Sequence, residues 1–447
     1  MSLVNTAVIE TSGGILTAPT GAEAPIARDI GTAKKPAFSL KRLLAFIGPG
    51  YLVAVGYMDP GNWATSLAGG SAFGYSLLSV LLLSNLMAML LQAASVRLGV
   101  ARGLDLAQAC REHFSSRVNW GLWITCEIAI VACNLAEVLG MACGLNLLFR
   151  LPLTAGVILT ALDVFLLLTL QRRGVRYLES VIIALVSLIA TCFAVQLWWL
   201  HPAGREIAAG FAPHAQLLRN PAMLYLAVGI VGATVMPHNL YLHSAIVRSR
   251  PHDGTREGVC QTIRYATLDS HIALGLALFV NIAIMVLAAG AFHRGGTALV
   301  LDLSSAYQLL SPLLGVGAAS AVFGVGLIAS GLSSSITGTL AGQVVMEGFL
   351  NLKVPRATRA TVTRGLALIP AVAVAAILGN EGIGKLLVVS QFILGIQLPF
   401  AVIPLLWFTT RRVYLGEHAF KPLTSSVLWG TAALVVLINC WVIYQGF

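Results

Sequence analysis

The chain has 447 residues, of which 57% are hydrophobic and only 10% are charged. Because soluble domains carry about 25% charged residues, this composition excludes an ordinary soluble protein and indicates a membrane protein with many spans. The formal net charge of +10 arises from basic residues that are dispersed among the loops, so it does not indicate a nucleic-acid binder. The seven cysteines contain no C-x-x-C pair, and we expect small buried hydrophobes without disulfides or a metal cluster.

Residues 1–42 are rich in Gly, Ala, Thr and Pro, and they lack the apolar core and cleavage site of a signal peptide. We expect them to form a disordered cytoplasmic tail. Eleven apolar runs follow, each close to the roughly 20 residues that a membrane-spanning helix needs. They lie at residues 43–70, 75–97, 119–147, 152–171, 177–200, 221–247, 265–291, 314–345, 362–380, 383–410 and 423–445.

The distribution of basic residues tests this map of spans. If the N-terminus is cytoplasmic, most of the 28 Lys and Arg residues fall in the tail and in the loops on the cytoplasmic side. Cytoplasmic loops of membrane proteins carry an excess of these residues, so we expect the N-terminus inside and the C-terminus outside. The longest outer loop, at about residues 292–313, is expected to carry a short amphipathic helix.

The first span contains a sequence that a continuous membrane helix does not favour. Residues 56–62 read Gly-Tyr-Met-Asp-Pro-Gly-Asn, which places Asp59 deep in an apolar run. Proline removes a backbone donor and disrupts the helix, while an ionised carboxylate at that depth costs about 2.5–3.5 kcal/mol on the milder insertion scales. We therefore expect an interrupted helix whose freed carbonyls, together with the side chains of Asp59 and Asn62, bind a cation.

The sixth span contains a matching sequence. Residues 236–239 read Met-Pro-His-Asn and repeat the placing of Pro and Asn in residues 59–62, which read Asp-Pro-Gly-Asn. The two breaks begin equivalent groups of five spans, residues 43–200 and 221–410, and an odd number of spans inverts the second group relative to the first. Residues 423–447 add an eleventh span. Paired interrupted helices in two inverted halves point to a substrate site at the middle of the membrane.

The residues at the two breaks indicate the kind of ion. Asp59 offers a hard anionic oxygen, Asn62 a neutral amide oxygen and Met236 a soft thioether, and the unwound backbone near Tyr57 or Ala233 offers a carbonyl. Oxygen ligands alone suit Mg²⁺ and Ca²⁺, whereas a sulfur ligand favours Mn²⁺, Fe²⁺, Co²⁺ and Cd²⁺. The alternative is that Met236 only packs in the core, as an isolated methionine in an apolar helix usually does.

Both motifs resemble those of the Nramp family of divalent-metal transporters, the bacterial proton-coupled manganese importers in particular. Residues 59–62 look like the motif of the family's first helix, and residues 236–244 look like that of its sixth. The similarity extends from about residue 43 to the end and includes residues 135–137 and 397–400. The resemblance implies an all-α, LeuT-like fold with eleven transmembrane helices, of which helices 1 and 6 are interrupted, and transport by alternating access.

The resemblance also implies the functional residues and the partners. The metal would be bound by the side chains of Asp59, Asn62 and Met236, by the carbonyl of Ala233 and, in some states of the transport cycle, by Gln391. The partners are a divalent metal ion, a proton and the lipid bilayer of a bacterial inner membrane, with no resident cofactor and with a monomer expected. The near neighbours of the site would be Tyr57, Thr234 and Asn281.

Several ionisable side chains lie within apolar spans, where an unpaired charge is costly. Glu137 lies deep in the third span, ten residues after Glu127, and Arg364 near the start of the ninth span is a candidate partner for Glu137. His238 and His243 follow the second break, and imidazole is suited to proton transfer near neutral pH. We expect a proton relay among these residues. The structural alternatives are that His238 caps the broken helix and that His243 hydrogen-bonds to a neighbouring span.

One residue departs from the family's pattern. The family typically has Asp-Leu-Ala-Glu in the third helix, whereas this chain has Asn134 three residues before Glu137. Because an asparagine cannot release a proton, we expect metal transport to survive and proton coupling to be weaker or to use Asp59 and Glu137 only. Asp163 in the fourth span and Asp269 in the seventh are expected to make structural hydrogen bonds.

The sequence thus predicts a secondary transporter that imports Mn²⁺ as its main substrate, with Fe²⁺, Cd²⁺ and Co²⁺ as further substrates. One rival with the same architecture is a transporter of amino acids or other organic solutes, in which Asp59 would pair with an amine. A second rival is a related Mg²⁺ carrier, against which the thioether of Met236 argues. We do not expect an enzyme, because the sequence contains no H-E-x-x-H, Walker-type or G-x-S-x-G motif.

Overall fold

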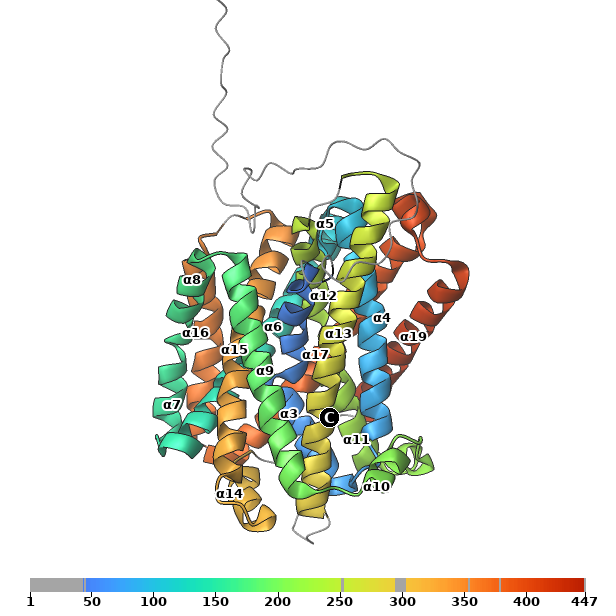
Figure 1. Ribbon diagram of the computed structural model, residues 1–447. Coiled ribbons are helices and arrows are strands. Elements are labelled where there is room, and N and C mark those ends of the chain that lie inside the picture. Colours follow the sequence, from blue (N-terminus) through green and yellow to red (C-terminus); the bar gives the residue numbers. More distant parts are fainter. Residues whose placement is uncertain are drawn as a thin grey trace, which may run out of the picture.

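The computed structural model describes residues 43, 46–250, 253–293, 303–352, 354–377 and 379–445, so the predicted tail at residues 1–42 lies outside the described residues. Regular structure in the described part is helical throughout, with no strand (Figure 1). The first half contains α2 (Pro49–Ala54), the 3₁₀ turn η1 (Val55–Met58), α3 (Pro60–Phe73), α4 (Leu78–Arg102), α5 (Leu106–His113), α6 (Ser116–Phe149), α7 (Leu153–Thr160), α8 (Asp163–Arg172), α9 (Val175–Leu200), α10 (Gly204–Gly210) and η2 (Ala215–Leu218).

The second half of the chain continues the same architecture. It contains α11 (Pro221–Thr234), α12 (Pro237–Ile246), η3 (Val247–Ser249), α13 (Arg256–Ala288), the π-helical turn η4 (Ala289–His293), α14 (Leu303–Leu314), α15 (Ala319–Leu350), α16 (Arg356–Ile377), α17 (Gly379–Thr410), α18 (Arg412–Leu415), η5 (Gly416–His418) and α19 (Pro422–Gln445).

Ten helical segments of the described chain are long and apolar enough to cross a membrane. They correspond to the second to eleventh predicted spans. The described part of the first predicted span is divided into α2, η1 and α3, and none of these pieces reaches the 18 residues required of a single spanning helix. Together with this interrupted span, the helices fill the eleven predicted places.

The two interrupted spans run in opposite directions through the bundle. In the sixth span, α11 lies toward the end of the bundle that carries α10, and α12 lies toward the end that carries α5 (Figure 1). In the first span the order is reversed, because its second part, α3, lies toward the α10 end (Figure 1). This arrangement is the one that an inverted repeat produces.

Several boundaries differ from the predicted ones because hydropathy marks the apolar part of a helix and not its ends. The helix α13 begins at Arg256 instead of residue 265, since the hydroxyl of Thr255 accepts a hydrogen bond from the N–H of Gly258 (3.1 Å) and caps an extra polar segment. The eighth span, predicted at 314–345, is α15, which extends to Leu350. The short helix predicted for the loop at about residues 292–313 is present as α14, and its location on the outer side stays a prediction.

The fourth span is broken, which the sequence map did not predict. It consists of α7, which ends at Thr160, and α8, which begins at Asp163. The hydroxyl of Thr160 donates to the carbonyl of Val157 in its own helix (2.7 Å). The break places the carboxylate of Asp163 in the first turn of α8, where the positive end of the helix dipole favours a negative charge.

The beginning of α2 is tied to α13 and lies close to α9. The carboxylate of Asp269 accepts hydrogen bonds from the N–H of Gly50 (2.7 Å) and of Gly48 (3.3 Å). Gly48 has a φ of 145°, and a Cβ atom there would overlap the carboxylate of Glu179, which pairs with Arg250 at 2.9 Å. The predicted structural role of Asp269 is therefore confirmed, and these contacts attach this end of the first span to α13.

Candidate metal site

The first break forms because its residues favour a chain that leaves one helix and enters another. Asp59 has an extended backbone (φ −69°, ψ 165°), and Pro60 takes the first position of α3, where a missing N–H costs nothing. The Oδ1 atom of Asp59 accepts a hydrogen bond from the N–H of Asn62 (2.8 Å), so the aspartate is the N-cap of α3. The break is thus fixed by local chemistry between residues 59 and 62.

The second oxygen of Asp59 is the most informative atom of the site. The side chain is fully buried, and Oδ2 has no hydrogen-bond partner within the described residues. Nor does a basic side chain of the described part pair with this carboxylate. A buried carboxylate oxygen without a partner carries a large desolvation cost, which a bound cation would offset. The arrangement therefore favours a cation site.

The amide of Asn62 shows where such a cation would lie. Its Nδ2 atom donates to Oδ1 of Asp59 (2.7 Å), to the carbonyl of Ala233 (3.0 Å) and, at longer range, to the carbonyl of Gly56 (3.3 Å). One nitrogen is therefore surrounded by three oxygen atoms that come from both interrupted spans. Rotation of the amide by about half a turn would direct its own oxygen to the same place. Asp59, Asn62 and Ala233, which the sequence predicted to be ligands, are thus brought together.

The second break has a different character. Helix α11 ends at Thr234, Met236 has an extended backbone (φ −76°, ψ 118°), and Pro237 begins α12. Met236 makes no capping hydrogen bond and is fully buried, packed with Cys133 of α6 and other apolar side chains. The break therefore leaves the thioether in the interior, three residues after the carbonyl of Ala233. The packing agrees with the alternative role as a core residue and leaves its role as a ligand a prediction.

Gln391 of α17 lies against both interrupted spans. A Cβ atom at Gly61 would overlap its amide nitrogen, and a Cβ atom at Gly232 would overlap its backbone carbonyl, so glycines make room for it on each side. The Nε2 atom donates to the hydroxyl of Ser390 (2.9 Å), while Oε1 is buried and has no partner among the described residues. A free amide oxygen at this position fits the predicted role as a further ligand.

The predicted near neighbours differ in what they contact. The carbonyl of Tyr57 accepts a hydrogen bond from Nδ2 of Asn281 (2.7 Å), which links the first break to α13. The hydroxyl of Thr234 donates to the carbonyl of Ile230 in its own helix (2.7 Å). Tyr57 and Asn281 therefore position the unwound backbone, whereas the Thr234 hydroxyl is used within α11.

A buried hydrogen-bonded chain connects the two interrupted spans through α4. The amide of Gln92 donates to the hydroxyl of Tyr57 (2.7 Å), and its oxygen accepts a hydrogen bond from Nδ1 of His243 (2.8 Å). The alternative role of His243, a hydrogen bond to a neighbouring span, is thus confirmed. Sequence reasoning missed Gln92, although a glutamine in the middle of an apolar span was a signal for it.

His238 does not cap the broken helix. The residue is buried, and its Nδ1 atom has no hydrogen-bond partner in the part of the chain that the structure describes. Pro237 already occupies the first helical position, where no N–H needs a cap. The structural alternative, in which His238 caps the helix, is therefore wrong, and its Nδ1 atom is available for another interaction.

The comparisons with known proteins decide the family. The family model "Natural resistance-associated macrophage protein-like", or Nramp, matches residues 50–445. The chain belongs to the Nramp family. It is 55% identical over 399 residues to the "Divalent metal cation transporter MntH" of Bradyrhizobium diazoefficiens, with 89% of each chain covered. The resemblance that the two motifs predicted is confirmed.

Solved structures agree with this assignment. The chain matches the Eremococcus coleocola manganese transporter with a TM-score of 0.85 and 39% identity, covering 91% of this chain and 88% of that one. A more distant match, with a TM-score of 0.57 and 14% identity, is Mhp1, a nucleobase-cation-symport-1 family transporter. This match covers 89% of this chain and 93% of that one and concerns the fold alone. The Nramp chain is therefore a multi-pass membrane protein with the predicted LeuT-like fold.

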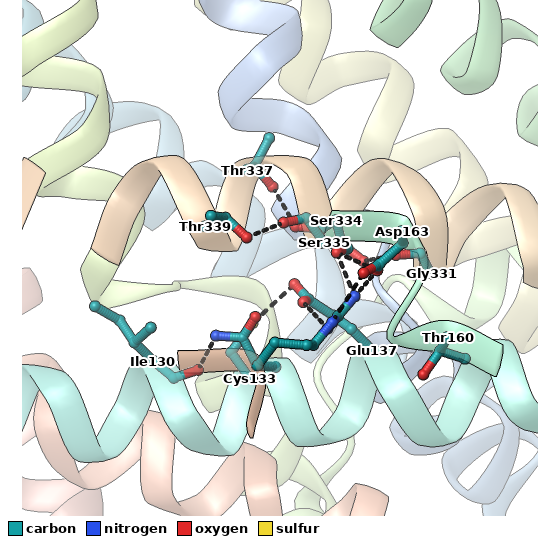
Figure 2. Close-up of polar contacts among 12 residues, drawn as sticks. Ile130, Cys133, Glu137, Thr160, Asp163, Gly331, Ser334, Ser335, Thr337 and Thr339 are labelled. Atoms are coloured by element: carbon teal, nitrogen blue, oxygen red, sulfur yellow. Dashed lines mark hydrogen bonds and ion pairs between the residues drawn. The ribbon is translucent and has the colours of Figure 1, made fainter. Parts of the chain in front are cut away.

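Glu137 of α6 belongs to a buried charge cluster that also includes Asp163 and Ser335 (Figure 2). Its Oε2 atom lies 3.7 Å from Nη1 of Arg364, so the predicted pairing is confirmed. The same guanidinium makes closer contacts with Asp163, to which its Nε atom donates at 3.0 Å. The hydroxyl of Ser335 also donates to Asp163 (2.6 Å). Asp163 thus makes an ion pair in addition to the structural hydrogen bonds that were predicted.

The remaining members of the predicted proton relay are not assembled in one place. Glu127 pairs with Arg359 at 2.5 Å and lies about 15 Å along α6 from Glu137, at 1.5 Å per residue. Asn134 donates from Nδ2 to the carbonyl of Ile130 in its own helix (2.8 Å). The structure of this Nramp chain therefore joins Glu137 and Arg364 and leaves Glu127 in a separate ion pair.

Proposed function

We propose that this Nramp chain imports a divalent transition metal by alternating access, with Mn²⁺ as the main substrate and Fe²⁺, Cd²⁺ and Co²⁺ as further ones. The observation that carries the proposal is the unpaired, fully buried Oδ2 atom of Asp59 beside converging oxygen atoms from both breaks. Similarity to proteins named as a divalent metal cation transporter and a manganese transporter supports the choice of substrate class.

The proposed ligands supply a graded set of donors. Asp59 contributes the charge, Asn62 and Gln391 contribute amide oxygens, Ala233 contributes a carbonyl, and Met236 contributes sulfur. Transition-metal dications accept both oxygen and sulfur ligands, whereas Mg²⁺ and Ca²⁺ prefer oxygen alone. Met236 would thus disfavour Mg²⁺ and Ca²⁺, which are more abundant in most environments.

The packing at the two ends of the bundle supports an alternating-access cycle. A cavity of about 630 Å³ lies between α3, α11 and α17 and is lined by Phe73, Tyr225 and Lys385, among others. At the other end, Asp269 holds the start of α2, and Arg248 pairs with Asp105 at 3.0 Å. We propose that the cavity belongs to the outer entry path and that release requires these inner contacts to open.

Proton co-transport is the second part of the proposal. Asp59 and Glu137 are the proposed acceptors, and His238 and His243 are proposed to assist, because an imidazole gains and loses a proton near neutral pH. Asn134 cannot take part, so weaker coupling remains a prediction for this chain. Proton movement driven by the membrane gradient would supply the free energy for metal accumulation.

The proposed setting is the bacterial inner membrane. The excess of Lys and Arg on one side supports a cytoplasmic N-terminus and an outer C-terminus. We propose a monomer as the working unit, because both halves of the site come from one chain. Neither a nucleic acid nor a resident cofactor is part of the proposed mechanism.

Uptake by reconstituted protein tests the proposal. In proteoliposomes, Asp59→Ala should lower uptake of Mn²⁺ and Cd²⁺ at least a hundredfold, because the only proposed anionic ligand is lost. Met236→Ala should reduce Cd²⁺ uptake most and admit more Ca²⁺ or Mg²⁺, since a soft ligand is replaced by none. The matched control is Met223→Ala, which removes another buried methionine, from the first turn of α11.

Two outcomes would contradict this function. If Met236→Ala and Met223→Ala give the same order of metal preference as the wild type, the thioether does not select the metal. If an amino acid drives a saturable uptake that Asp59→Ala abolishes while no metal is transported, the organic-solute alternative is correct. Equal transport of Mg²⁺ and Mn²⁺ by the wild type would favour the Mg²⁺ carrier.

A further inference from the structure

Two carboxylates share one guanidinium in the interior of the bundle. Glu137 of α6, Asp163 of α8 and Arg364 of α16 come from three different spans. Ser335 of α15 contacts Asp163 and Arg364, and Figure 2 shows it beside Asp163. The side chains of the three charged residues are at most 6% exposed. Because bulk solvent does not screen these charges, an uncompensated charge in the cluster is costly in free energy.

The guanidinium is not shared equally. Asp163 accepts a hydrogen bond from Nε of Arg364 (3.0 Å), contacts the Nη2 atom of Arg364 and accepts a hydrogen bond from the hydroxyl of Ser335 (2.6 Å). The same hydroxyl accepts a hydrogen bond from Nη2 of Arg364 (2.5 Å). Among the described residues, Glu137 has only the 3.7 Å approach of Nη1 of Arg364 and a thiol contact from Cys133 at 3.6 Å, and its Oε2 atom has no hydrogen-bond partner there. Asp163 therefore holds the positive charge, and Glu137 lies beside it.

The count of charges then determines where a proton belongs. Two ionised carboxylates and one guanidinium would leave an uncompensated negative charge in the interior, which is unfavourable. The α8 N-terminus and three hydrogen-bonding contacts stabilise the charge on Asp163. Glu137 has no comparable set of donors. The proton that balances the cluster therefore belongs on Glu137.

The other groups that face Glu137 do not change this balance. On its own helix the neighbours are Cys133 and the neutral amide of Asn134, whose oxygen lies against Gly338 of α15 as the Glu137 carboxylate does. Toward the metal site, Pro60 lies against Gly140, so Asp59 is the next carboxylate in that direction. Arg364 is thus the single cation of this group of described residues.

We propose that Asp163 is a positioning residue for proton coupling: by engaging Arg364 it leaves Glu137 free to take up and release a proton. It supplies from α8 the second carboxylate that Asn134 does not supply from α6. This inference rests on the proposed proton co-transport and makes it more specific. Without the charge of Asp163, Arg364 would pair with Glu137 alone and hold it ionised.

The experiment compares Mn²⁺ uptake and internal acidification in proteoliposomes. Asp163→Asn should lower the number of protons moved per Mn²⁺ at least fivefold and flatten the pH profile of uptake. Binding of Mn²⁺ to the purified protein should stay within twofold, which also shows that the variant folds. Asp163→Glu keeps the carboxylate and should keep the wild-type number of protons moved per Mn²⁺. Asn134→Asp combined with Asp163→Asn should recover at least half of that number.

A second variant keeps the test valid if Asp163→Asn does not fold. Ser335→Ala removes the hydroxyl that joins Asp163 and Arg364 and should lower the proton ratio in the same direction, by about twofold. If the wild type acidifies the vesicles and Asp163→Asn has the same ratio of protons to Mn²⁺ and the same pH profile, the role of Asp163 is wrong but the proposed transport stands. If Asp163→Asn cannot be obtained, the same result in Ser335→Ala leads to the same conclusion. Mn²⁺ uptake by the wild type without any acidification overturns proton co-transport and this inference together, and absence of Mn²⁺ uptake overturns the proposed function itself.

Discussion

Asp59 and Glu137 are both fully buried carboxylates in the membrane interior, yet their surroundings are opposite. Among the described residues, Asp59 has no basic partner and has one oxygen without a hydrogen bond. Glu137 lies 3.7 Å from Arg364, a permanent cation that Asp163 also contacts. The difference suggests that the two carboxylates have different functions. A site that must bind and release a dication cannot hold a fixed positive charge, whereas a site that handles only protons can.

The two sites also differ in whether backbone groups or side chains surround the carboxylate. Around Asp59 the polar groups are carbonyls and amides that become available because two helices are interrupted, such as the carbonyls of Ala233 and Gly56. Around Glu137 the polar groups are side chains that come from several spans, including Ser335 and Arg364. Backbone that is irregular at this depth is tolerated where it lines a site. The metal site therefore required the breaks, and the charge cluster required side chains with precise partners.

Removal of the permanent cation should have the largest effect on stability. Arg364→Met leaves Asp163 and Glu137 without their shared partner, and breaking a buried ion pair costs about 3–5 kcal/mol. We expect a clear loss of thermal stability in detergent. The matched control is Arg359→Met on the same helix, because its partner Glu127 is 19% exposed while Glu137 is fully buried. Equal losses in the two variants would show that burial of the cluster does not matter.

Metal addition should separate the two sites by their response. Mn²⁺ at 100 times its dissociation constant should stabilise the wild type by about 2.7 kcal/mol, since it binds the folded state only. Thermal unfolding with and without Mn²⁺ measures this gain. Asp163→Asn should keep the gain and Asp59→Ala should lose it. A gain that survives in Asp59→Ala would place the metal elsewhere.

The sequence predicted the metal site better than the charge cluster, for a physical reason. Proline, glycine and asparagine act on the backbone within a few residues, so the motifs at 59–62 and 236–239 indicated both breaks and most of the proposed ligands. The matching order of these residues in the two halves also predicted the inversion. Such signals are local and can be read without knowing which helices are neighbours.

Pairings between distant side chains could not be found in this way. The contact of Asp163 with Arg364 and that of Gln92 with His243 depend on how four helices pack, and no motif records it. The break before Asp163 was also missed, because residues 160–163 contain neither proline nor glycine. Single polar residues in apolar spans were the only available signal. Such a residue indicates that a polar contact exists but does not identify the other residue in the contact.

Substitution of Thr234 should have the smallest effect and would sharpen the limits of the metal site. Its hydroxyl donates to the carbonyl of Ile230 in the same helix, so it adds no ligand to the oxygen atoms that converge near Asp59. Thr234→Val keeps a β-branched side chain of similar size, and we expect the dissociation constant for Mn²⁺, measured by calorimetry, to change less than twofold. The contrasting variant is Asn62→Leu, which removes an amide within hydrogen-bond distance of both Asp59 and Ala233 and should weaken binding at least tenfold. If Thr234→Val weakened Mn²⁺ binding as strongly as Asn62→Leu, the hydroxyl would have to leave its helix and join the metal, and the ligand set would extend one residue further along α11.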